Sequence, residues 1–168
     1  MKIAIIYSTS NKSTKKSCKI LSGEIKANVQ MIPIEKAKAE CLLKYNYTIL
    51  AASSYNGKVQ TEFKRYISRN MKTLQEKPIA LILNCENEID IKDRLNKTFT
   101  EELAKSSIIN SNFGYELDPY EGNLIEKRKI NKIIDNYKKE GKKLPTLNMD
   151  EIYKFADYIN NMIEKRVD

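Results

Sequence analysis

The stretch Tyr7-Ser8-Thr9-Ser10-Asn11-Lys12-Ser13-Thr14-Lys15 joins two segments that differ in hydrophobic periodicity. Residues 3–7 before it are almost continuously apolar, which is typical of a strand that helices cover on both faces. Residues 14–25 after it carry small or apolar side chains at helical spacing, with lysines between them. The predicted order is therefore strand, polar loop, helix.

This polar loop has the groups that bind a phosphate monoester. It contains several hydroxyls and Lys12, and the helix after it would begin with backbone N–H groups that no helical carbonyl satisfies. An ordinary helix N-cap is the alternative interpretation, since Ser and Thr commonly begin helices. We favour the phosphate site because the loop has more hydroxyls than one cap needs.

Length and composition limit the possible functions. The 168 residues suffice for one domain, which we place at 1–168. The chain has no histidine, which removes the commonest general base, the commonest metal ligand and the usual catalytic triads. No segment is long and apolar enough to cross a membrane, and the first apolar run is too short for a signal peptide. We therefore expect a cytoplasmic protein whose chemistry is carried by a cofactor.

Cysteine spacing and net charge give little evidence for a metal site or a nucleic-acid partner. Cys18, Cys41 and Cys85 show no C-x-x-C spacing and are expected to be small buried hydrophobes. The formal net charge of +8 suits an anionic partner such as nucleic acid or lipid. A simpler interpretation is that the lysines keep helix faces in water. We favour this simpler interpretation for the whole chain except one basic region, and we expect no nucleic-acid partner.

Strand-like and helical segments alternate along the chain, which predicts an open α/β sheet of parallel strands. Five strands are expected, at 3–7, 28–34, 47–52, 79–83 and 107–113. The second is placed at an edge because it contains Pro33, and the fifth because it is less apolar. In such sheets ligands lie at the carboxyl ends of the strands, where strand order reverses. The loops after the first, third and fourth strands should meet there.

The helical segments include a basic insertion. Helices are expected over 59–74, from about Leu95 to Leu103, and over 149–164. Before the last of them lies the insertion, residues 115–148, whose length is typical of a functional or disordered segment. Its helical pattern places Ile130, Ile133, Ile134 and Tyr137 opposite Lys127, Arg128, Lys129 and Lys132, and a basic loop is expected at 138–143.

Several phosphate-binding classes lack their motifs here. No G-x-G-x-x-G follows the first strand and no G-x-x-x-x-G-K-[ST] is present, so dinucleotide and nucleoside triphosphate sites have no support. Phosphoacceptor receiver domains need acidic residues after strand one and an aspartate at the end of strand three. The chain has Tyr7-Ser8 and Ala52-Ser53 at those places, so this class is excluded as well.

The remaining pattern resembles the flavodoxin superfamily, and within it the flavodoxin-domain family that includes menaquinone-dependent protoporphyrinogen dehydrogenase. The likeness covers nearly the whole chain and rests on residues 1–14, 52–58, Leu83-Asn84 and 113–118, followed by the basic insertion. It implies a doubly wound, five-stranded parallel sheet of order 2-1-3-4-5, with the basic helical segment inserted before the last helix. It also implies flavin mononucleotide (FMN) as the cofactor.

The resemblance implies three groups of FMN-binding residues. The phosphate would be surrounded by Ser8, Thr9, Ser10, Asn11, Lys12, Ser13 and Thr14. The isoalloxazine would be flanked by Ser53, Ser54, Tyr55, Asn56, Gly57 and Lys58, with Tyr55 as the stacking side chain. The polar edge of the ring would meet Asn84, Cys85, Glu86 and Asn87. A surface position for Tyr55 and a turn or capping role for Asn84 are the alternatives.

Two features depart from typical flavodoxins. The phosphate loop has Asn11-Lys12 where Gly-Asn is common, which bears on flavin affinity. The chain is also basic where the electron carriers are typically acidic, which disfavours docking to the basic faces of their usual redox partners.

Three functions are consistent with these observations. The first is an FMN-dependent oxidoreductase, of which protoporphyrinogen oxidation is the most specific form. The second is an FMN electron-transfer protein without its own substrate, and the third is a domain that has lost flavin and acts as a binding module. Expected partners are a redox protein or a quinone- or porphyrinogen-type small molecule.

The insertion is the expected site of partner selection. Its Lys and Arg side chains would attract porphyrinogen propionates or the anionic lipid around a quinone, at the inner face of a membrane. Its stripe from Ile130 to Tyr137 would lie on that membrane or, alternatively, pack against the domain.

Overall fold

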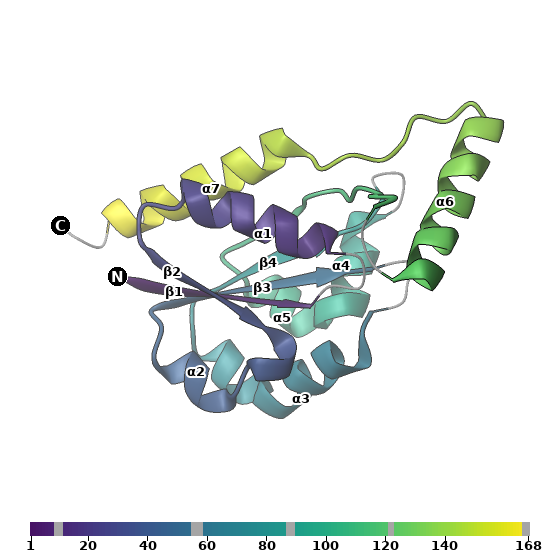
Figure 1. Cartoon of the computed structure of the whole chain (residues 1–168). Helices are drawn as coiled ribbons and strands as arrows, with labels where there is room; N and C mark the ends of the chain where they lie inside the picture. The colour runs from purple at the N-terminus through teal and green to yellow at the C-terminus, as the bar shows by residue number, and fades with distance from the viewer. Residues whose placement is uncertain (9–11, 55–58, 87–89, 121–122, 166–168) are drawn as a thin grey trace.

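The computed structural model is a parallel sheet between two layers of helices (Figure 1). It describes residues 1–8, 12–54, 59–86, 90–120 and 123–165. The strands are β1 (Lys2–Ser8), β2 (Asn28–Pro33), β3 (Tyr47–Ser53), β4 (Ile79–Asn84) and β5 (Ile109–Asn112). Their order is β2-β1-β3-β4-β5 and every pairing is parallel, which confirms the predicted fold and both edge strands.

Helices cover both faces of the sheet. They are α1 (Ser13–Glu24), the 3-10 turn η1 (Ile34–Lys36), α2 (Ala39–Leu43), α3 (Thr61–Gln75), α4 (Ile91–Phe99), α5 (Glu101–Ser106), α6 (Leu124–Lys139) and α7 (Met149–Glu164). Successive side chains of β1 enter opposite cores. Ile3 and Ile5 pack with α1 and α7, whereas Ala4 and Ile6 pack with α3, α4 and α5. This two-sided burial explains why the strands are continuously apolar.

Three elements show the main differences from the prediction. The helix expected from Leu95 to Leu103 is two helices, because Thr100 has φ 74° and its hydroxyl accepts a hydrogen bond from the Leu103 N–H. Helix α6 continues through Lys139, so the first residues of the expected basic loop are helical. Strand β5 is shorter than expected.

Two buried asparagines continue the pairing of β4 and β5 beyond the last strand residues. The Cys85 N–H donates to Asn112 Oδ1 (3.2 Å), and Asn112 Nδ2 donates to the Cys85 carbonyl (3.3 Å). The Gly114 N–H also donates to Asn112 Oδ1 (3.0 Å), and Asn84 Nδ2 donates to the Gly114 carbonyl (2.8 Å). The loop after β4 is thereby tied to the turn at Gly114.

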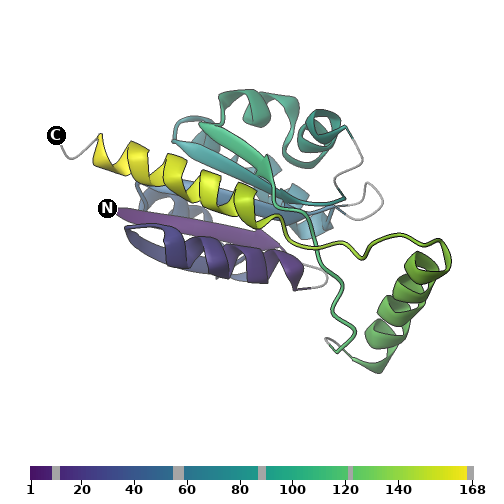
Figure 2. The same ribbon diagram turned by 90° about the horizontal axis from the view of Figure 1, so that it is seen from above.

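The insertion leaves and rejoins the body at neighbouring points. Gly114 pairs with Leu147 in an antiparallel bridge, and the Asn148 N–H donates to the Phe113 carbonyl (2.9 Å). Between these points α6 stands apart from the sheet and from the helices that cover it (Figure 2). Its buried Ile134 belongs to neither of the two cores.

Two of the three cysteines are buried, as the sequence predicts. Cys18 and Cys85 are buried free thiols, whereas the Cys41 side chain is outside the described part. Burial raises the pKa of Cys18 to about 12 and that of Cys85 to about 11, so neither is a reactive thiolate at neutral pH. No helix within the described ranges is long and apolar enough to cross a bilayer.

Gly114 gives the first testable prediction. It has φ +65°, and a Cβ at this position would lie 2.7 Å from the Thr146 carbonyl oxygen, a backbone atom that cannot move aside. We expect Gly114→Ala to lower the free energy of unfolding by about 3 kcal/mol. Gly141 also has φ +65° but has open space around it, so Gly141→Ala should cost only about 1 kcal/mol. Urea denaturation measures both, and equal losses would show that the contact with Thr146 is unimportant.

Candidate functional site

The N-terminus of α1 lies directly after the polar loop and has no side-chain cap from the described residues. Lys12 occupies the N-cap position with φ 57°, and its side chain makes no capping hydrogen bond. Lys16 donates its N–H to the Lys12 carbonyl (2.9 Å), so the N–H groups of residues 13–15 precede the first helical hydrogen bond. These groups and the helix dipole favour an anion at this end of the helix.

Thr14 places a hydroxyl at the same helix end. It is 0% exposed, and its Oγ1 has no hydrogen-bond partner within the described part of the chain. Leaving a buried hydroxyl unpaired costs about 1–3 kcal/mol, so such groups are rare and indicate an absent partner. The orphaned hydroxyl and the uncapped helix end together point to a ligand with hydrogen-bond acceptors.

The segment after β5 closes against this helix end. The Glu116 N–H donates to Ser13 Oγ (3.1 Å), and the Glu116 carboxylate pairs with Lys16 Nζ at 2.6 Å. The ion pair is partly exposed and adds little stability. It neutralises an acid that would otherwise oppose an anion at the start of α1.

The ends of β1, β3 and β4 meet beside α1, as the sequence predicts. Ser8 is buried, and its hydroxyl donates to the side-chain oxygen of Gln60, the N-cap residue of α3. Ser53 is half-buried at the end of β3, and the Ser54 N–H donates to the Asn84 carbonyl (3.1 Å). Arg94 Nη1 of α4 then reaches the Ser54 carbonyl (3.4 Å), which adds a cation to this edge.

Asn84 and Cys85 are already engaged within the protein. The Asn84 amide donates to Gly114, and its Oδ1 lies 3.2 Å from the Ser17 hydroxyl of α1. The backbone N–H and carbonyl of Cys85 both bond Asn112. These two residues hold the loop after β4 in place, whereas the Glu86 side chain extends toward the insertion.

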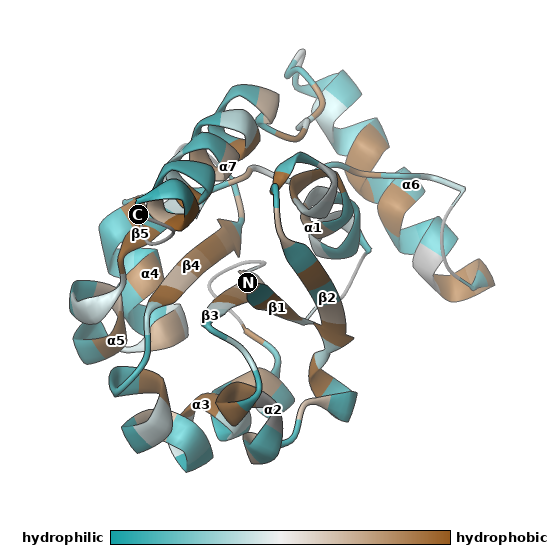
Figure 3. Cartoon of the chain, turned by 90° about the vertical axis from the view of Figure 1, so that its left-hand side faces the viewer, coloured by the Kyte–Doolittle hydropathy of each residue, from teal (hydrophilic) through white to brown (hydrophobic). Residues whose placement is uncertain are grey.

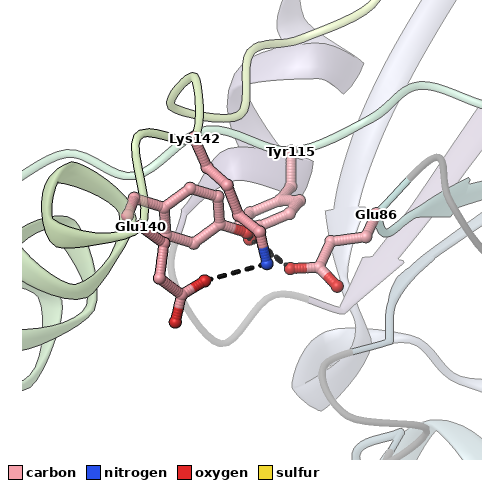
Figure 4. Close-up of polar contacts among 5 residues, drawn as sticks. Glu86, Tyr115, Glu140 and Lys142 are labelled. Carbon is pink, nitrogen blue, oxygen red and sulfur yellow. Dashed lines mark hydrogen bonds and ion pairs between the residues drawn. The ribbon is translucent and has the colours of Figure 1, made fainter.

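Glu86 accepts hydrogen bonds from two tyrosines of different segments, and we call these three residues the Glu86 cluster (Figure 4). Glu86 Oε1 lies 2.9 Å from Tyr115 Oη and 2.7 Å from Tyr137 Oη, and the two hydroxyls are 3.0 Å apart. Burial and these hydrogen bonds raise the pKa of Tyr115, and burial raises the pKa of Tyr137. Both hydroxyls therefore stay protonated at neutral pH and hold the carboxylate as donors.

The structure brings together some of the predicted site residues and adds others. Lys12, Ser13 and Thr14 form the start of α1, and Ser8, Ser53, Ser54, Asn84, Cys85 and Glu86 lie at the carboxyl edge of the sheet. The predicted residues outside the described part are Thr9, Ser10, Asn11, Tyr55, Asn56, Gly57, Lys58 and Asn87.

Four further residues contact this region that the sequence analysis did not name as site residues: Gln60, Arg94, Tyr115 and Tyr137, the last of which it assigned to the apolar stripe of the insertion. Their contacts join positions far apart in the chain, 51 residues in the case of Glu86 and Tyr137, and no local periodicity reports such pairs. No group of three or more potential metal ligands occurs within the described ranges.

Removal of the Tyr137 hydroxyl tests how α6 is held. Tyr137→Phe deletes one charge-assisted hydrogen bond of the Glu86 cluster, which is worth about 1.5–3 kcal/mol. We expect amide exchange in α6 to become about tenfold faster or more, with little change in the two cores. Tyr120→Phe is the control, because Tyr120 is 85% exposed and lies just before the same helix. Equal exchange rates in the two variants, measured by mass spectrometry, would contradict this role of the cluster.

Solved flavodoxins share this fold. Oxidised flavodoxin 2 from Bacillus cereus is 17% identical, with a TM-score of 0.52 over 83% of this chain and 99% of that chain. A short-chain flavodoxin associated with a bacterial microcompartment is 15% identical, with a TM-score of 0.53 over 83% and 98%. Two-electron reduced Megasphaera elsdenii flavodoxin is 10% identical, with a TM-score of 0.53 over 67% and 82%. At these identities the likeness establishes the fold alone.

The family of the chain follows from a sequence-family model, whereas the solved structures establish only the fold. A search of curated protein sequences finds no match. The family model described as "Flavodoxin domain" matches residues 4–143, from β1 to the residues after α6. This range contains the start of α1, the carboxyl edge of the sheet and the Glu86 cluster. The chain therefore belongs to the flavodoxin domain family.

Proposed function

We propose that this protein binds FMN, with the phosphate at the N-terminus of α1, and acts in electron or hydride transfer. The buried, unpaired hydroxyl of Thr14 carries the proposal. A phosphate there would accept hydrogen bonds from Thr14 Oγ1 and from the first N–H groups of α1. Membership of the flavodoxin domain family supports FMN as the source of that phosphate.

The local charge also suits a phosphate. Lys12 and Lys15 are exposed in the first turn of α1 and add positive charge to that of the helix end. The nearby carboxylate of Glu116 is paired with Lys16. Thr9, Ser10 and Asn11 complete the proposed phosphate loop, and Lys12 holds the positive-φ position where a glycine would meet no steric cost.

We place the isoalloxazine at the carboxyl ends of β3 and β4. Residues 53–58 would flank it, with Tyr55 stacking on the ring and Gly57 allowing close approach of the backbone. Asn84, Cys85, Glu86 and Asn87 belong to the opposite loop. Arg94 supports this placement, since its guanidinium bonds Ser54 and adds positive charge between the two loops.

FMN supplies the redox chemistry when it is bound. The residues of this chain would hold the cofactor, exclude competing reactants and present it to a partner. We favour an oxidoreductase, with a protoporphyrinogen-dehydrogenase-like reaction as its most specific form, because Tyr137 of α6 bonds Glu86 in the loop after β4 and so ties the insertion to the carboxyl edge of the sheet. An electron carrier without its own substrate is the second candidate, and a flavin-free binding module is the third.

Titration of the apo-protein with FMN, followed by flavin fluorescence, tests the proposal. We expect Thr14→Val to weaken FMN binding about tenfold or more, because a hydrogen bond to a charged phosphate is lost. Thr48→Val is the matched control: Thr48 is equally buried and its hydroxyl is also unpaired among the described residues, but it lies near the opposite end of β3. Neither variant should destabilise the apo-protein, since each removes an unsatisfied hydroxyl.

The outcomes separate the candidate functions. A wild-type protein that retains no FMN would exclude both redox functions and leave the binding module. Equal affinities of the Thr14 and Thr48 variants would place the phosphate elsewhere. If FMN binds, activity toward an artificial electron acceptor but not toward porphyrinogens or quinones would identify a carrier.

A further inference from the structure

The inward side of α6 faces the protein rather than a partner. Ile134 is buried, Ile130 and Ile133 are partly buried, and Tyr137 belongs to the Glu86 cluster. The isoleucine stripe that the sequence offered as a membrane contact is therefore directed toward the domain. Any external partner of α6 must approach its other side.

The other side is the outward face of α6, formed by Leu124, Ile125, Arg128, Lys132, Asp135 and Lys139. At 100° per residue these six positions fall within an arc of about 100°. All six side chains are exposed. Figure 3 shows a hydrophobic start of the helix, followed by hydrophilic bands that alternate with hydrophobic ones.

Large apolar side chains are exposed at the start of this face. Leu124 is 76% exposed and Ile125 65%, and Tyr120, which precedes them, is 85% exposed. Single exposed hydrophobic residues are common on protein surfaces, but a cluster of them is typical of an interaction site. Tyrosine and aliphatic side chains are both frequent at the boundary of a bilayer.

Positive charge lies on the same face. Arg128, Lys132 and Lys139 are opposed there only by Asp135, as far as the described residues show. Lys143 extends the charge beyond the helix end, whereas Lys142 pairs with Glu140 and points toward the Glu86 cluster (Figure 4). Basic side chains near exposed apolar ones are suited to a surface that has anionic groups on the outside and an apolar layer beneath them.

We infer that the outward face of α6 docks on an anionic lipid bilayer, with Leu124 and Ile125 in the interfacial region and the basic side chains on the headgroups. The position of α6 supports a bilayer over an acidic protein. The helix protrudes from the body in both views (Figures 1 and 2), so a protein partner would need a groove to bury it. A bilayer accepts a protruding helix of about 24 Å lying in its plane.

Vesicle sedimentation and fluorescence test this inference without the flavin, so the result is independent of the FMN titration. We expect the protein to sediment with vesicles of 70% phosphatidylcholine and 30% phosphatidylglycerol but not with pure phosphatidylcholine. The pair Lys132→Glu and Lys139→Glu should weaken partitioning at least about tenfold. The control pair Lys64→Glu and Lys72→Glu makes the same change of net charge at exposed positions of α3 and should have little effect.

A tryptophan probe reports the contact directly, because the chain contains no tryptophan. In Leu124→Trp the emission should shift to shorter wavelength on addition of the anionic vesicles. In Tyr153→Trp, at a 44% exposed position of α7, it should not shift. Equal losses for the two charge-reversed pairs would overturn the inference, as would an unchanged Leu124→Trp emission. Binding to polyglutamate as tight as to vesicles would also overturn it and indicate an acidic protein partner.

Discussion

Two buried amides hold the carboxyl edge of the sheet together. Where the pairing of β4 and β5 stops, the backbone groups of Cys85 and Gly114 would be buried without partners, at a cost of about 1–3 kcal/mol for each. Asn112 and Asn84 supply those partners with their side chains. Because both amides bond Gly114, they also fix the turn from which the insertion departs. The rest of the candidate site depends on this arrangement.

The two residues after that turn serve opposite ends of the site. Tyr115 bonds Glu86 beside the loop after β4, whereas Glu116 bonds Ser13 and Lys16 at the start of α1. Adjacent residues in an extended segment direct their side chains to opposite sides, so one short stretch contacts both regions. The proposed phosphate site and the proposed isoalloxazine site are thus connected by this segment of the protein itself.

The sequence predicted the sheet well because each strand carries its own local signal. The continuous apolar runs of β1, β3 and β4 follow from burial on both faces, and Pro33 correctly marked an edge. The break at Thr100 was missed because a hydroxyl cap at a positive φ has no periodicity. The Glu86 cluster was missed for a different reason, since it joins segments whose proximity only the fold creates. For the start of α1, the sequence indicated hydroxyls but not that the one at Thr14 is buried and unpaired.

The two ends of the insertion lie next to each other, because the Asn148 N–H at its end donates a hydrogen bond to the Phe113 carbonyl just before its start. A chain that ran directly from β5 into α7 would therefore need no rearrangement of either core, because Ile134 contributes to neither. The cost of closing a loop grows only slowly with its length. Segments of different length and chemistry can thus be exchanged at this junction during evolution, and the choice of partner can diverge while the sheet and its edge are inherited unchanged.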